Sequence, residues 1–122
     1  MKQEDKDLLL RDLCARLPYG VKGVEANTLC SLNTVTRFKS IVKNIEYKIE
    51  HLGFKPYLFP LSSMTEEQSM EFALLQVNTH KDGFLYVCDC ANMMKWLLKN
   101  HFDIYGLIEK GLAIDATNLN IY

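Results

Sequence analysis

The chain has 122 residues, of which 48% are hydrophobic and 24% are charged, and its net charge is −1 at pH 7. This length and composition favour a single folded domain over residues 1–122 and exclude an intrinsically disordered chain. No apolar run approaches the roughly 18–20 residues of a membrane span, and the acidic start MKQEDKD lacks the basic region of a signal peptide. We therefore expect a cytoplasmic protein that has no membrane partner.

The first predicted element is an amphipathic helix over residues 2–17. Leu10, Leu13 and Leu17 recur at helical spacing and form one apolar stripe, and the pattern stops before Pro18. An N-terminal helix with one apolar face needs a core to pack against, and the rest of the chain must supply it.

Residues 19–60 have the pattern of a small, mostly β half. Its clearest predicted strand is IEYKIE at residues 45–50, in which apolar and charged side chains alternate strictly. Pro56 and Pro60 bracket residues 57–59, which predicts an edge strand, a strand end or an extended connector, because proline donates no ladder hydrogen bond. Three or four short strands with short links suit a small antiparallel sheet or an SH3-like barrel.

Two main helices are predicted in residues 61–122. Thr65 and Gln68 have the spacing of a capping box, so the first should run from about residue 65 to about 78. Its apolar stripe consists of Met70, Ala73, Leu74 and Val77. We expect this central helix to pack onto the sheet. The second should run from about residue 86 to about 100, followed by a short turn of helix at 105–110 that Gly111 ends.

The predicted fold class is therefore α+β. It comprises an N-terminal helix, the small antiparallel sheet or SH3-like barrel, two main helices and a docked tail from about residue 112. Charge divides the single domain in two. Residues 19–60 hold six basic and three acidic side chains, a net of +3, while residues 61–122 hold four basic and eight acidic ones, a net of −4. The β-rich half is basic and the helical half is acidic.

Catalytic and metal-binding patterns are weak. Cys88 and Cys90 are too close for the usual zinc spacing, and only His80 and His101 could complete a site. We expect all four cysteines to be free thiols, because the chain has no export signal. His101 and Asp103 are better explained as helix-end residues around an apolar plug, Phe102, than as an acid–base pair. No phosphate loop, nucleophile elbow or paired-carboxylate motif occurs, so no cofactor, metal or catalytic residue is assigned.

The basic half supplies a candidate binding face. It consists of Arg37, Lys39, Lys43, Lys48, Lys55 and Tyr57. Lysines and aromatics on a small barrel can bind single-stranded nucleic acid through phosphate contacts and stacking. The plainer alternative is a solvated strand face.

Three segments resemble a known family. They are the opening DLLLRDLCARLPYGVK, the junction KPYLFPLSSMTEEQ and the end KNHFDIYGLIEKGLAIDATNLNIY. Together they are similar to a family of small uncharacterised proteins of gut Bacteroides-type bacteria and their phages or mobile elements, over about half of the chain. The resemblance implies a bacterial or phage intracellular setting and an accessory role, and it brings no activity, cofactor or catalytic residue.

The sequence leaves three functional hypotheses. The leading one is a non-enzymatic binding or adaptor module of phage or mobile-element origin, for which self-association is one option, with the basic half of one copy against the acidic half of another. The alternative is a nucleic-acid-binding protein that uses the basic face. The third is a small metal- or thiol-dependent enzyme that uses Cys88, Cys90 and His101.

Overall fold

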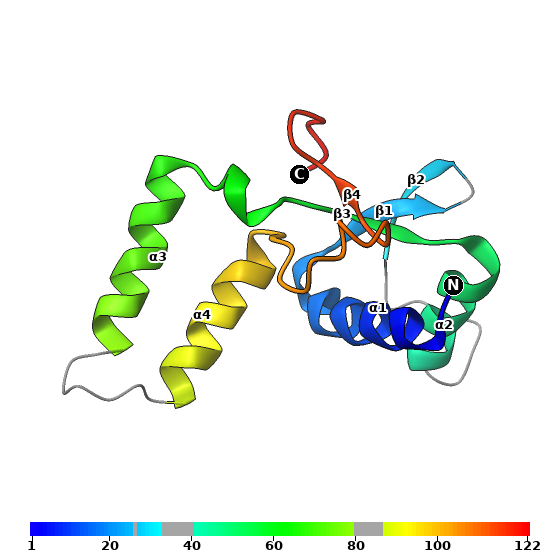
Figure 1. Cartoon of the computed structure of the whole chain (residues 1–122), viewed down its shortest axis with the longest axis horizontal. Helices are drawn as coiled ribbons and strands as arrows, with labels where there is room; N and C mark the ends of the chain where they lie inside the picture. The colour runs from blue at the N-terminus through cyan, green and yellow to red at the C-terminus, as the bar shows by residue number, and fades with distance from the viewer. Residues whose placement is uncertain (26, 33–40, 80–86) are drawn as a thin grey trace.

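The computed structural model describes residues 1–25, 27–32, 41–79 and 87–122, with the side chains of 41, 76–79 and 87–89 outside that description. The chain forms two lobes (Figure 1). One lobe, the body, contains helices α1 and α2 and the sheet. The other is a pair of helices, α3 and α4, that projects from it. The α+β class and the N-terminal helix are confirmed.

The body is built on α1, Gln3–Arg16, and α2, Ile41–Leu52, which lie on one side of the sheet (Figure 1). Leu9 and Leu13 of α1 and Ile45 and Ile49 of α2 are at most 4% exposed and pack in one hydrophobic core. A short 3-10 turn, η1 at Leu17–Tyr19, ends α1 where the proline was expected to end it. The prediction of the first helix is confirmed.

The strand predicted at residues 45–50 is wrong, because these residues belong to α2. Ile45 and Ile49 are four residues apart, and that spacing places them on one face of a strand and also on one face of a helix. The flanking residues favour the helix, because Ile41 and Leu52 continue the helical spacing. Both lie outside the six residues from which the strand was predicted.

The sheet has four strands in the order β2-β1-β3-β4. They are β1 Lys22–Glu25, β2 Thr28–Ser31, β3 Lys55–Leu58 and β4 Ile114–Asp115. β1 pairs antiparallel with β2 and β3, whereas β3 pairs parallel with β4 from the tail. The sheet is therefore mixed and open, and the described strands do not close into the SH3-like barrel given as an alternative.

β3 lies inside the sheet although it contains Pro56. β1 pairs with its first half, Lys55 and Pro56, and β4 pairs with its second half, Tyr57 and Leu58. Each neighbour thus borders only part of the strand, and a proline is tolerated there. At Gly23 of β1, an added Cβ would overlap the Phe54 ring, so the close passage of β1 over that ring requires glycine.

The second lobe begins with η2, Leu61–Ser63, and continues into α3, Glu66–Thr79, and α4, Val87–Lys99. The capping box at the start of α3 is confirmed. The Gln68 amide N–H donates to Thr65 Oγ1 at 3.1 Å, and the Thr65 N–H donates to Gln68 Oε1 at 2.9 Å. The expected packing of α3 onto the sheet is wrong, since α3 packs chiefly against α4 (Figure 1).

Two Schellman motifs, each closed by a left-handed residue, shape the segment that returns to the body. His101, with φ +63°, follows α4, and the N–H groups of residues 101 and 102 donate to the carbonyls of Leu98 and Leu97. This is a Schellman motif. Gly111, with φ +74°, closes a second Schellman motif. Residues 105–110, where a short turn of helix was predicted, form bends and turns and no helix. The tail then docks through β4 and the buried Ala116, as expected.

Candidate functional site

The predicted basic face is placed on two different elements. Lys43 and Lys48 lie on α2, where the exposed Glu46 and Glu50 alternate with them, and Lys55 and Tyr57 lie on β3. Lys43 and Lys55 are exposed, and Tyr57 is half-buried. Arg37 and Lys39 lie outside the described residues. The described members therefore do not form one strand face.

Lys48 is engaged inside the body. Its ammonium donates to Glu25 Oε2 at 3.0 Å, and the Cys30 thiol donates to the same oxygen at 3.1 Å. Burial raises the pKa of Glu25, but the two hydrogen bonds and the Lys48 charge outweigh burial and lower it overall. Burial and the neighbouring carboxylate raise the pKa of Cys30 to about 11. This thiol is protonated at neutral pH and is a poor nucleophile.

The residues proposed for metal or thiol chemistry are separated along α4. Cys90 is exposed in the first turns of the helix, and His101 follows its last turn. The side chain of Cys88 lies outside the described ones. Within the described part of the chain, no cluster of three or more His, Cys, Asp or Glu side chains could hold a metal ion.

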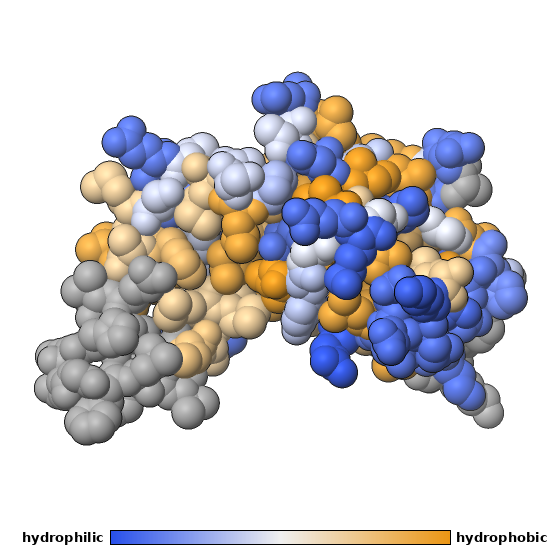
Figure 2. Space-filling model, viewed as in Figure 1, coloured by the Kyte–Doolittle hydropathy of each residue, from blue (hydrophilic) through white to orange (hydrophobic). Residues whose placement is uncertain are grey.

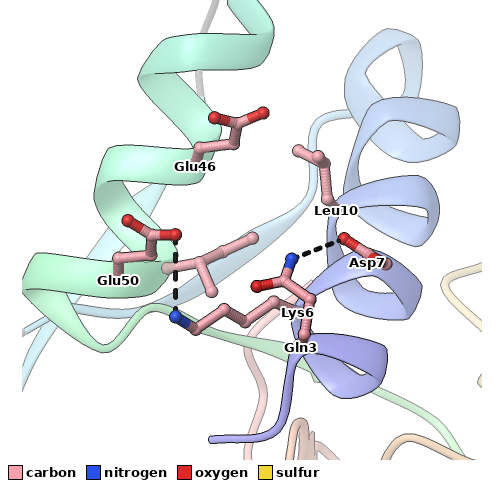
Figure 3. A pocket seen from close by; sticks show the side chains of 7 residues that line it. Gln3, Lys6, Asp7, Leu10, Glu46 and Glu50 are labelled. Atoms are coloured by element: carbon pink, nitrogen blue, oxygen red, sulfur yellow. Dashed lines mark hydrogen bonds and ion pairs between the residues drawn. The ribbon is translucent and has the colours of Figure 1, made fainter.

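Two cavities lined by described residues are small. One of about 120 Å³ lies between α1 and α2 (Figure 3), where Lys6 pairs with Glu50 at 3.6 Å and Gln3 donates to Asp7 at 2.9 Å. The Lys6–Glu50 pair joins the two helices, whereas Gln3 and Asp7 both belong to α1. A second, of about 220 Å³, lies beside Phe59 and Phe102. Both are below the roughly 300–1,000 Å³ typical of small-molecule sites.

The α3–α4 lobe carries exposed apolar side chains that we call the hairpin patch. It consists of Met70, Ala73 and Leu74 on α3; Cys90, Ala91 and Met94 on α4 are exposed as well but are not counted in it. From residue 66 to 75 no side chain of α3 is buried, and Met70 and Leu74 are 66% and 64% exposed. Figure 2 shows hydrophobic residues over much of this lobe. Exposed apolar clusters of this kind typically mark interaction surfaces.

The apolar stripe of α3 lies opposite the face that contacts α4. Phe72 packs against Trp96 of α4 with ring centroids 5.4 Å apart, and Gln68 and Leu75 on the same side are half-buried. Met70 and Leu74 are two residues before and after Phe72. At ~100° per residue, they point to the other side of the helix.

Carboxylates border this stripe. Glu66, Glu67 and Glu71 are all exposed, and α3 contains no lysine, arginine or histidine. The indole N–H of Trp96 donates to Glu71 Oε2 at 3.1 Å, and Glu71 forms no ion pair within the part of the chain that the structure describes. Within the described residues, Glu66 and Glu67 have no ion-pair partner.

Aromatic rings fix the lobe to the body. Trp96 stacks on Phe102 with centroids 5.7 Å apart, and Phe102 contacts Phe59 at 6.3 Å. Beneath them the buried Arg16 donates to both carboxylate oxygens of Asp12, at 2.7 and 3.1 Å, and to the Phe102 carbonyl at 2.6 Å. Burial raises the pKa of Asp12, and Arg16 offsets only part of that rise. The lobe is thus anchored at its base, and its far end extends away from the body.

The sequence also indicates that α3 has a second apolar face. A helix with one buried face has one apolar stripe, but α3 has two, because Phe72 and Leu75 lie off the stripe of Met70 and Leu74. One of the two faces meets α4, and the other is exposed.

Comparison of the chain with protein-family models, with curated proteins and with solved structures finds no match. Among the described residues, no helix has both the length and the apolar character required to cross a bilayer.

Proposed function

We propose that this chain is a non-enzymatic binding module whose working surface is the hairpin patch. The observation that carries the proposal is the exposure of α3, in which no side chain from residue 66 to 75 is fully buried and Met70 and Leu74 are 66% and 64% exposed. Isolated two-helix lobes seldom gain enough stability from propensity alone, so an apolar outer face favours a further layer supplied by a partner.

The rest of the described chain supports a binding role over catalysis. The Cys30 thiol is held protonated by Glu25, and Cys90 and His101 lie at opposite ends of α4. Covalent catalysis requires an activated nucleophile, whereas the Cys30 thiol stays protonated with a pKa of about 11 and Cys90 lies far along α4 from His101. Nucleic-acid binding through Lys43 and Lys55 stays a prediction, which a salt titration between about 50 and 200 mM tests.

Site-specific photo-crosslinking tests the binding proposal. A photoreactive amino acid is placed at position 74, or at position 29 as a control, in cells of the native host. Leu29 on β2 is a matched control because it is also a leucine, is 54% exposed and lies on the body. We expect a discrete higher-mass adduct from position 74 and none from position 29. Equal labelling from both positions, or none from position 74, would contradict the proposal.

A further inference from the structure

The outer face of α3 combines an apolar stripe with charge of one sign. Met70 and Leu74 are four residues apart and therefore adjacent on the helix surface. Glu66 lies one turn before Met70 on one side of the stripe, and Glu67 and Glu71 lie on the other side at ~100° per residue. All five side chains are exposed.

The apolar stripe and the glutamates beside it favour one class of partner. A helix that lays an apolar face on Met70 and Leu74 brings its flanking residues close to Glu66, Glu67 and Glu71. Acidic flanks there would meet carboxylates at short range, whereas lysine or arginine flanks would form ion pairs. The unbranched, polarizable side chain of Met70 adapts to different apolar partners.

We infer that the outer face of α3 binds a basic amphipathic helix of a partner protein. This inference rests on the proposed function and adds the chemical class of the partner. A second copy of this chain offering its own α3 is a poorer fit, because α3 carries three glutamates and no basic residue, and the two helices would repel.

The chain contains its own reporter for the test. Trp96 is the only tryptophan, its indole N–H is bonded to Glu71, and its ring packs on Phe72. A cationic helix that approaches Glu71 changes the surroundings of this indole. Binding of a peptide without tryptophan can therefore be followed by Trp96 emission.

The probe is an 18-residue amphipathic peptide of leucine and lysine, compared with a twin in which glutamate replaces every lysine. We expect the lysine peptide to shift Trp96 emission saturably, with an affinity that falls as salt rises from about 50 to 300 mM. The glutamate twin should bind at least about tenfold more weakly. Equal binding of the two peptides, or no binding of the lysine peptide, overturns the inference.

Variants locate the binding to α3. Leu74→Gln removes part of the stripe and Glu67→Lys reverses one flanking charge, and each should weaken the lysine peptide by about fivefold or more. Leu29→Gln and Glu109→Lys make the same changes at exposed positions of the body and should leave its affinity unchanged. Equal weakening by both sets overturns the inference.

Sedimentation of the chain without peptide tests whether a second copy of the chain covers the outer face of α3. We expect a monomer whose sedimentation is unaffected by Leu74→Gln. A dimer that Leu74→Gln dissociates would show that a second copy covers the face, and it would overturn the basic-helix inference while leaving the binding role of the hairpin patch intact. A photo-crosslinked adduct from position 74, together with no binding of the lysine peptide, would also overturn the basic-helix inference and leave the binding role of the hairpin patch intact.

Discussion

The rings of His101 and Tyr122 lie face to face, with centroids 3.5 Å apart and 10° between their planes. His101 holds a left-handed backbone conformation at the end of α4, and Tyr122 comes from the docked tail. The Tyr122 hydroxyl accepts from the Lys22 N–H at 2.8 Å and donates to the Tyr57 carbonyl at 2.9 Å. One side chain thereby joins the end of α4 to β1 and β3.

The Tyr122 hydroxyl should contribute measurably to stability. It sits where the register of β1 and β3 would next pair Lys22 with Tyr57, and it bridges the two backbones there. Tyr122→Phe should lower the free energy of unfolding by about 1–2 kcal/mol in urea denaturation, because two backbone groups lose a partner. Tyr105→Phe is the control, because Tyr105 is about as exposed as Tyr122 but its hydroxyl makes no hydrogen bond among the described residues, and it should change the free energy of unfolding by less than about 0.5 kcal/mol. Equal effects of the two substitutions would contradict the bridge.

His101 should make the fold sensitive to acid. Burial, together with the charges of Arg16 and Lys22, lowers the pKa of His101 to about 4, and its Nδ1 has no hydrogen-bond partner among the described residues. The unfolded chain, with a pKa near 6.5, therefore binds more protons between pH 6.5 and 4. Stability should fall as pH falls through this window, by on the order of 1–2 kcal/mol after allowance for partial exposure.

His101→Asn is the control for that titration. Asparagine tolerates the left-handed conformation but does not titrate, so the variant should have a flatter pH dependence than the unmodified chain from pH 6.5 to 4. Identical slopes in urea titrations of the two proteins would show that the ring of His101 is not the acid-sensitive group.

Removing one member of the buried Asp12–Arg16 ion pair should lower the free energy of unfolding strongly, whereas replacing both members by apolar residues should lower it less. Both side chains are fully buried, so Arg16→Met leaves a carboxylate without its cation and should cost about 3–5 kcal/mol. The double variant Asp12→Leu/Arg16→Met removes both charges and should recover much of that loss. If the double variant is no more stable than Arg16→Met in denaturant titrations, the prediction that the unpaired carboxylate causes the loss is wrong.

The cysteines should differ in reactivity. Cys90 is exposed on α4, whereas Cys30 is half-buried and donates to Glu25, with a pKa of about 11. Mass spectrometry after a brief iodoacetamide treatment at pH 8 should find Cys90 alkylated well before Cys30. Glu25→Gln should speed the reaction of Cys30, since it removes the carboxylate charge. Comparable rates at both sites in the unmodified chain would be inconsistent with the Glu25 contact.

Local signals predicted much of the fold. Thr65 and Gln68 form the capping box that their spacing indicates, and Phe102, 1% exposed, is the apolar plug expected between His101 and Asp103. The strand at 45–50 failed because Ile45 and Ile49 fit both periodicities, and only the longer window that includes Leu52 favours the helix.

Features set by distant parts of the chain were beyond prediction from local pattern. The Tyr122 contacts join residues 65 and 100 positions apart, and nothing near Tyr122 in sequence specifies them. The stripe of Met70 and Leu74 was found from its spacing, but spacing shows only that a helix face is apolar. Whether that face is covered depends on where the other helices lie, and here α4 covers the opposite side.

The free energy of unfolding of the Met70→Gln/Leu74→Gln double variant tests the central claim most directly. If both side chains belong to a binding surface, the variant should unfold within about 0.5 kcal/mol of the unmodified chain, because glutamine and the original residues have similar helix propensities and no core contact is lost. A loss of about 2 kcal/mol or more would show that the stripe belongs to the core and would contradict the claim.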